Sequence, residues 1–170
     1  MAFAKIALDQ GHKPDAVENI KKYFLEDDGK EFLMANLLQV KTGEVTHPVT
    51  KSPIKASKLL DEYSTPFFKA AIPRACHPVM FARAKGGYVD SWNVPPNPGW
   101  TNAGVVRYRT RRDLMAVVLD PRFKDIHVFK ELSLDCTFAF PCRPILYVGP
   151  RVWVFQTLAL GFALLHIAFS

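Results

Sequence analysis

The chain has 170 residues, of which 49% are hydrophobic and 22% are charged. This length allows one domain with a proper core plus an appendage, and it excludes two ordinary domains. The formal net charge of +6 arises from closely alternating acids and bases, which argues against a nucleic-acid-binding surface.

The first predicted element is a helix that begins at Pro14. Proline tolerates the first turn of a helix, and the acidic side chain of Asp15 complements the helix dipole there. Ile20 and Phe24 share its apolar face, and Asp27-Asp28-Gly29 ends it. No basic region followed by an apolar run precedes this helix, so we predict no signal peptide and a domain that faces the cytosol.

A buried strand and a second helix are predicted next. Glu31–Val40 is apolar nearly throughout, as in a strand that is buried on both faces. Thr42–Pro53 contains glycine, threonine and two prolines without periodicity, and it is predicted to be a loop. From Lys55 the apolar residues recur at helical spacing, until Pro66 and Pro73 disturb or end the helix.

The middle of the chain is predicted to contain a bent pair of strands. Val79–Ala84 and Tyr88–Trp92 flank Lys85-Gly86-Gly87, where the glycines allow a bulge or turn. Asn93–Gly99, with three prolines and a glycine, is predicted to be a hairpin-type connection.

Trp100–Arg109 is predicted to be the next strand, in which Val106 and Tyr108 point to the opposite side from Val105. A dense basic stretch begins in this strand and runs into the following helix; it comprises Arg107, Arg109, Arg111 and Arg112. We interpret this stretch as a solvated face that meets water or anionic headgroups.

The last part of the predicted domain is helical and then extended. Arg111–Leu119 is predicted to be a helix, Asp120-Pro121 breaks it, and Arg122–Leu134 resumes it. Cys136–Pro141 supplies a short final strand. The predicted order is a helix followed by βαββαβ, which gives an α+β domain with a ferredoxin-like antiparallel sheet and helices on one face. The other sheet face is then left bare.

Several of these segments resemble one protein family. They are Phe32–Val40, Gly86-Gly87-Tyr88, the run from Gly104 to Met115, Asp120–Phe123 and His127–Lys130. Over roughly residues 31–141 they resemble the DUF1330-type branch of the dimeric α+β barrel superfamily. The resemblance implies the ferredoxin-like fold and a tendency to pair sheet to sheet with a second copy or a homologous domain. It implies no reaction, because that superfamily includes monooxygenases, haem-handling proteins and members without known activity.

Candidate catalytic residues are scattered and form no motif with a mechanism behind it. They are His77, Tyr88, Asp90, Arg109, His127 and Lys130. The adjacent side chains of Cys76 and His77 point apart in an extended segment, and His12 and His47 fall in predicted loops. No catalytic residue is therefore predicted, although an enzyme that uses an organic cofactor inside the barrel stays open as an alternative.

The cysteines indicate neither a disulfide framework nor a zinc site. Cys76, Cys136 and Cys142 form no Cys-x-x-Cys pair, and no histidine cluster accompanies them. We therefore expect reduced thiols and no metal.

The C-terminal segment Val152–Ser170 carries no Asp, Glu, Lys or Arg. As a helix it would be about 28 Å long, close to the ~30 Å hydrocarbon core of a bilayer. We therefore predict a single transmembrane helix. Arg143 and Arg151 precede it and favour a cytoplasmic domain with a periplasmic C-terminus, while Trp153 suits the membrane interface.

His166 is the one ionisable residue in the predicted span. Either it reaches the outer headgroups, or its neutral imidazole is the axial ligand of a bacteriochlorophyll or a haem. Ala159 and Ala163 lie seven and three residues before it and place small side chains on the same helix face. His166 is thus the predicted cofactor-binding residue.

The span is also similar to light-harvesting α polypeptides of purple bacteria. The similar residues are Gly149–Trp153 at one end and Ala163–Ser170 at the other. The distance from Pro150 to His166 is a few residues shorter than in that family, and the aromatic tail after the histidine is absent. The resemblance implies that His166 binds bacteriochlorophyll.

The sequence predicts four segments and one function. The segments are residues 1–30 as a helical extension, 31–142 as the α+β domain, 143–151 as a juxtamembrane linker and 152–170 as the transmembrane helix. We expect a single-pass, non-catalytic accessory subunit of a photosynthetic (light-harvesting or reaction-centre) or respiratory complex in the inner membrane. A membrane-tethered enzyme of the barrel superfamily, monooxygenase-like or haem-handling, and a tail-anchored scaffold protein are the alternatives.

Overall fold

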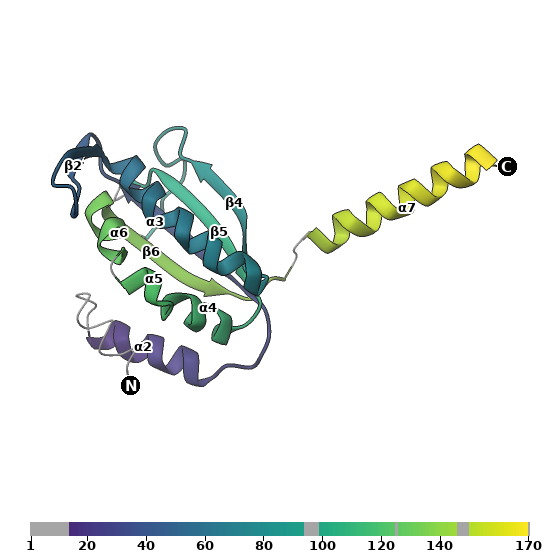
Figure 1. Cartoon of the computed structure of the whole chain (residues 1–170), viewed down its shortest axis with the longest axis horizontal. Helices are drawn as coiled ribbons and strands as arrows, with labels where there is room; N and C mark the ends of the chain where they lie inside the picture. Colours follow the sequence, from purple (N-terminus) through teal and green to yellow (C-terminus); the bar gives the residue numbers. More distant parts are fainter. Residues whose placement is uncertain (1–13, 94–98, 125, 146–149, 170) are drawn as a thin grey trace.

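The computed structural model describes residues 14–93, 99–124, 126–145 and 150–169, which form an α+β domain and a C-terminal helix that extends away from it (Figure 1). The elements are α2 (Pro14–Leu25), β1 (Phe32–Val40), β2 (Glu44–Thr46), β3 (Pro53–Lys55), α3 (Ala56–Ala71), the short 3-10 helix η1 (Ile72–Arg74), β4 (His77–Arg83), β5 (Asn102–Tyr108), α4 (Arg111–Val118), α5 (Pro121–Lys124), α6 (His127–Ser133), β6 (Leu134–Cys142) and α7 (Pro150–Phe169).

Four strands form one antiparallel sheet in the order β4-β5-β1-β6. Phe32 of β1 pairs with Tyr108 of β5, and Met34 pairs with Val106. Since side chains alternate along a strand, these four residues share one face of the sheet. The predicted α+β class and the four-stranded antiparallel sheet are confirmed.

The core lies between this face and the helices. Its buried members are Phe32, Val106 and Tyr108 from the sheet and Ala70, Ala71, Cys76, Leu114 and Val117 from the segments that cover it. The rings of Phe32 and Tyr108 stack with centroids 5.1 Å apart. The prediction that Val106 and Tyr108 point to the same side is therefore confirmed.

Three local predictions are wrong. Glu31–Val40 is not buried on both faces, because helices cover the sheet on one side and most of β1 is only half-buried. The predicted loop Thr42–Pro53 contains β2 and the first residue of its partner strand β3. At three residues each, these strands are too short to show a two-residue alternation. Tyr88–Trp92 is not a strand, and its large apolar side chains are exposed.

The prolines after Lys55 act differently from each other. α3 runs through Pro66 to Ala71, so this proline does not end the helix. Pro73 lies in η1, after which Ala75 adopts a left-handed conformation with φ of 56° and the chain turns into β4. The connection predicted for Asn93–Gly99 lies mostly outside the described residues.

The predicted N-terminal extension packs on the domain through α2. Arg111 at the start of α4 donates a hydrogen bond from Nη1 to the carbonyl oxygen of Tyr23 at 2.7 Å, and its guanidinium lies 4.3 Å from the centroid of the Tyr23 ring. Arg112 adds a 2.7 Å ion pair to Asp27. The two helices are therefore joined by charge-assisted contacts as well as by aromatic packing.

Thr110 caps the N-terminus of α4 together with Asp113 in the first turn. The backbone N–H of Asp113 donates to Thr110 Oγ1 at 3.1 Å, and its carboxylate accepts bonds from Arg109 at 2.8 and 2.9 Å. The Arg109 hydrogen bonds hold the pKa of Asp113 below its ordinary value, against the opposing effect of burial. Asp113 is thus stabilised in its charged form.

This carboxylate predicts a pH-dependent stability. Because the pKa is lowered in the folded state, the stabilisation is present above the ordinary Asp pKa and is lost as pH falls through the folded value. Asp113→Asn should lower the free energy of unfolding at neutral pH and have little effect well below the ordinary Asp pKa, as measured by urea unfolding in mild detergent. Asp61→Asn, at an exposed position on α3, is the matched control and should show no such difference. An Asp113→Asn effect of equal size at both pH values would contradict the prediction.

His47, which falls in a predicted loop, is a buried structural residue. Its Nδ1 accepts hydrogen bonds from the backbone N–H groups of Val49 and Thr50, each at 3.1 Å. Nδ1 must therefore be unprotonated, so the proton is on Nε2 and is donated to Glu62 across 3.0 Å. The ring also packs edge-on against Phe129 at 5.2 Å.

Replacing His47 by Ala should destabilise the domain by about 1 to 3 kcal/mol, because two backbone N–H groups lose their acceptor. His47→Asn is the control: its side-chain oxygen can accept the same bonds in an Asx turn, so it should restore part of the loss. Thermal unfolding of the three chains measures both effects. Equal losses for Ala and Asn would show that ring packing, rather than the accepted bonds, matters.

Candidate functional site

The candidate catalytic residues do not converge on one site. Tyr88 and Asp90 lie exposed in the segment after β4, and Arg109 is bound to Asp113. His77 is half-buried at the start of β4, with Nδ1 3.1 Å from the carbonyl oxygen of Pro78. Cys76 beside it is buried, and burial raises the pKa of its thiol.

His127 and Lys130 both lie close to Tyr63, a residue that is not among the candidate catalytic residues. The His127 ring lies 6.0 Å from the Tyr63 ring, and Lys130 Nζ lies 6.0 Å from the same ring. Burial lowers the pKa of Lys130 and raises that of Tyr63 to about 12. His127 also lies 3.6 Å from Glu131. In the sequence, Tyr63 is one of the apolar residues at helical spacing after Lys55, which is typical of a packing position.

α7 has the properties expected of a membrane span. The 18 residues Val152–Phe169 are long and apolar enough to cross a bilayer, and none of them is buried against the domain. His166 lies near the end of this helix and is exposed. No group of three or more His, Cys, Asp or Glu side chains among the described residues could hold a metal ion.

The sheet face opposite the core is largely apolar, with Arg107 and His77 at one end of it. We call it the open sheet face; by strand register it contains Leu33, Ala35, Leu37, Met80, Val105, Phe138 and Phe140. Phe138, Phe140 and Met80 are 57%, 43% and 45% exposed, and the two phenylalanine rings lie 5.6 Å apart. A contiguous apolar surface of this kind is typical of an interaction site.

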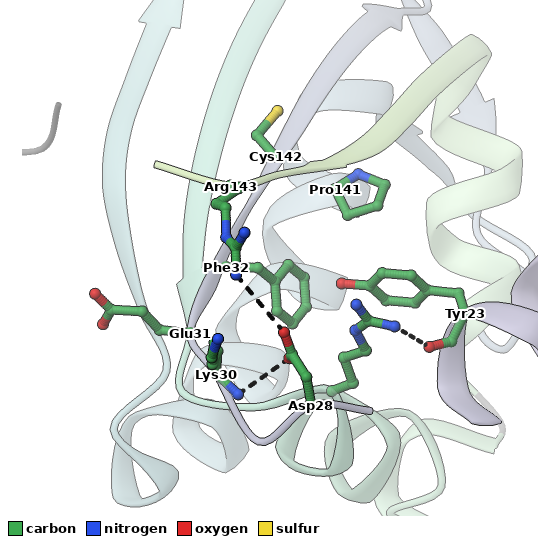
Figure 2. A pocket seen from close by; sticks show the side chains of 9 residues that line it. Tyr23, Asp28, Lys30, Glu31, Phe32, Pro141, Cys142 and Arg143 are labelled. Carbon is green, nitrogen blue, oxygen red and sulfur yellow. Dashed lines mark hydrogen bonds and ion pairs between the residues drawn. The ribbon is translucent and has the colours of Figure 1, made fainter. Parts of the chain in front are cut away.

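A pocket of about 320 Å³ lies where β1 begins and β6 ends. Its wall is made of residues from α2, the stretch that leads into β1, the start of α4 and the end of β6. It comprises Tyr23, Asp28, Lys30, Glu31, Phe32, Arg111, Pro141, Cys142 and Arg143 (Figure 2). Three of these residues are cations and two are carboxylates. Of its three cations, the sequence singles out Arg111 as part of the basic stretch and Arg143 as a positive charge before the apolar segment.

The basic stretch is not a uniformly solvated face. Arg112 is exposed, but Arg107 is buried, where it binds Glu31 and donates a 2.7 Å bond to the carbonyl oxygen of Ala75. Arg109 and Arg111 are also engaged with partners inside the domain. The earlier interpretation is therefore correct for only part of the stretch.

Comparisons with known proteins show the fold alone. No known family model matches the chain, and no curated protein matches it. A crystal structure of RPA0582, a protein of unknown function from Rhodopseudomonas palustris, superposes with a TM-score of 0.64 at 10% identity, over 80% of this chain and 96% of that one. The methylated form of RPA0582 gives the same TM-score and identity, over 82% and 94% of the two chains. The DUF1330 and light-harvesting resemblances gain no family-level support and stay predictions.

Proposed function

We propose that this protein is a single-pass, membrane-anchored accessory subunit without a catalytic role, whose domain packs on a partner through the open sheet face. The observation that carries the proposal is the combination of an exposed apolar helix with a second, separate apolar surface on the sheet. One surface suits lipid and the other suits protein. Two such surfaces on one small chain are typical of a part of an assembly.

The partner surface is proposed to be another sheet, from a second copy or a homologous domain. The strand order β4-β5-β1-β6, with α3 and α4 to α6 as the two crossover connections, supports a ferredoxin-like assignment. In that arrangement two open faces can pack at the ~10 Å spacing of stacked sheets. Phe138 and Phe140 would then lie inside the interface.

The host assembly is proposed to be photosynthetic or respiratory, with the domain cytoplasmic and the C-terminus periplasmic. This orientation rests on Arg143 and Arg151 before the span. Pigment binding through His166 rests on its position in an apolar helix beside small residues. Both belong to the proposal.

Purification of the full chain from its native membrane in mild detergent tests this function. Stoichiometric partner subunits and a pigment or haem absorbance band are expected. His166→Leu should remove or shift that band while membrane insertion is kept, because Leu is the less costly residue in a span. Gln156→Leu removes another polar group from α7 and should leave the spectrum unchanged. A colourless chain without partners would contradict the proposal.

A membrane-tethered enzyme is the second candidate, and the contacts of Tyr63 favour it. A half-buried lysine of lowered pKa close to a tyrosine ring, which a histidine ring also approaches, is a reactive arrangement. Substrate turnover that is lost in Lys130→Met but kept in Lys69→Met, at an exposed position of α3, would favour this candidate.

A further inference from the structure

We infer that the pocket between α2, β1 and β6 binds a phosphate group, and that the headgroup of an anionic lipid is its source. This inference rests on the membrane anchoring proposed above. It concerns residues of the domain, not of the span.

The pocket presents hydrogen-bond donors that other groups leave available. Tyr23 Oη is buried, yet it has no hydrogen-bond partner in the part of the chain that is described. Figure 2 shows this hydroxyl pointing toward Phe32 at the centre of the pocket. Burial raises the pKa of Tyr23 to about 12, so the hydroxyl keeps its proton and can donate it to an anion.

Three cations line the same pocket as this hydroxyl. Arg111 donates from Nη1 to the carbonyl oxygen of Tyr23, and its guanidinium lies over the Tyr23 ring, so its charge is held at the pocket wall. Lys30 and Arg143 are exposed at the rim. Guanidinium and ammonium groups that converge with a hydroxyl donor are the groups that recognise phosphate oxygens in proteins.

The two carboxylates of the pocket offset only part of these three charges, because Asp28 alone faces them. Glu31 is held by Arg107, whose Nε donates to it at 2.8 Å, and Figure 2 shows Glu31 pointing away from the pocket centre. Asp28 accepts a bond from the backbone N–H of Lys30 and lies 4.0 Å from Arg143. That separation is a loose, exposed ion pair, so Arg143 can turn to a stronger anion.

The position of the pocket favours a membrane-borne ligand. Arg143 precedes the first residue of α7 by seven positions, and an extended chain of that length spans at most about 25 Å. A pocket tethered so near the bilayer meets headgroups at an effective concentration of the order of millimolar. A weak site would therefore be occupied at the membrane.

The test uses the full chain in nanodiscs and measures backbone hydrogen exchange of residues 27–32. Discs of phosphatidylcholine with a minor fraction of phosphatidic acid should slow this exchange by at least about threefold relative to pure phosphatidylcholine. The reason is that a bound ligand stabilises the folded conformation of residues 27–32 against local unfolding. Tyr23→Phe and the double variant Lys30→Gln, Arg143→Gln should each remove most of the protection. The double variant Lys55→Gln, Lys58→Gln removes equal charge from exposed positions outside the pocket and should keep it.

Asp28→Asn adds a test with the opposite sign. It removes a carboxylate that would repel the proposed phosphate, so protection of residues 27–32 should increase. Asp61→Asn adds the same net charge at an exposed position outside the pocket and should give no such gain. No protection by phosphatidic acid, or equal loss in the Lys55 and Lys58 control, would overturn the inference.

Inorganic phosphate distinguishes the source of the ligand and separates the two proposals. Protection by inorganic phosphate in pure phosphatidylcholine discs, without protection by phosphatidic acid, would overturn the lipid source and leave a site for free phosphate. If the chain does not insert into discs at all, the anchoring proposal fails. The phosphate arm can then be run on the chain in solution, where absence of protection overturns the pocket itself.

Discussion

Truncation of the chain before Gly149 is expected to release a folded domain from membranes. The apolar residues of the span each contribute a few tenths of a kcal/mol to insertion, and together they exceed what surface charge contributes at high salt. None of the span is buried against the domain, so its removal should leave the core intact. Sedimentation of membranes in high salt, with the domain's fold checked by circular dichroism, measures both effects.

Reversal of the order of residues 152–169 provides the control for this truncation. The reversed helix keeps its hydropathy and length, so it should still anchor the chain. If the truncated chain sediments with membranes in high salt, residues outside α7 hold it there and the anchor assignment is wrong.

Phe138→Glu combined with Phe140→Glu is expected to abolish association through the open sheet face. Both rings are partly exposed in the single chain, so the glutamates should cost the isolated domain little stability. In a sheet-to-sheet interface the same carboxylates would be buried without partners, at a cost of several kcal/mol. Light scattering of the full chain in mild detergent should show an assembled wild type and a dissociated variant.

The matched control places glutamates at two exposed aromatic residues outside the sheet, Tyr88 and Trp92. It makes the same chemical change on another surface, so association should persist. A wild-type chain that is monomeric at all concentrations, with solvated Phe138, would contradict sheet pairing. An association lost equally in both variants would place the contact elsewhere.

The elements predicted well from sequence have strong local signals. α2 has proline in its first turn, β5 alternates between core and open faces, and α7 lacks charged residues after Arg151. The wrong predictions concern segments whose secondary structure depends on pairing with a distant strand rather than on local sequence. Strands β2 and β3 are three residues long, and Tyr88–Trp92 has the composition of a strand but no partner in the described sheet.

The candidate pocket was beyond sequence reasoning for a geometric reason. Tyr23, Arg111 and Arg143 are separated by many residues and meet only because β1 pairs with β6 while α2 packs on α4. Arg111 is one of four arginines in the basic stretch, and nothing in the sequence distinguishes it from Arg107. In the structure Arg107 forms an ion pair with Glu31, whereas Arg111 lines the pocket. Lys130 carried a weak signal, but its neighbour Tyr63 became visible only in the folded chain.

The two outer strands of the sheet carry built-in protection against fibre growth. β4 contains Pro78, which has no N–H to offer, and an irregularity in its pairing follows between Pro78 and Met80. β6, at the opposite edge, contains Pro141. Prolines and bulges at sheet edges discourage open-ended strand addition between molecules. If α7 anchors the chain as proposed, copies meet often in the bilayer. This protection would then suppress polymerisation along the strand edges while the proposed face-to-face pairs stay accessible.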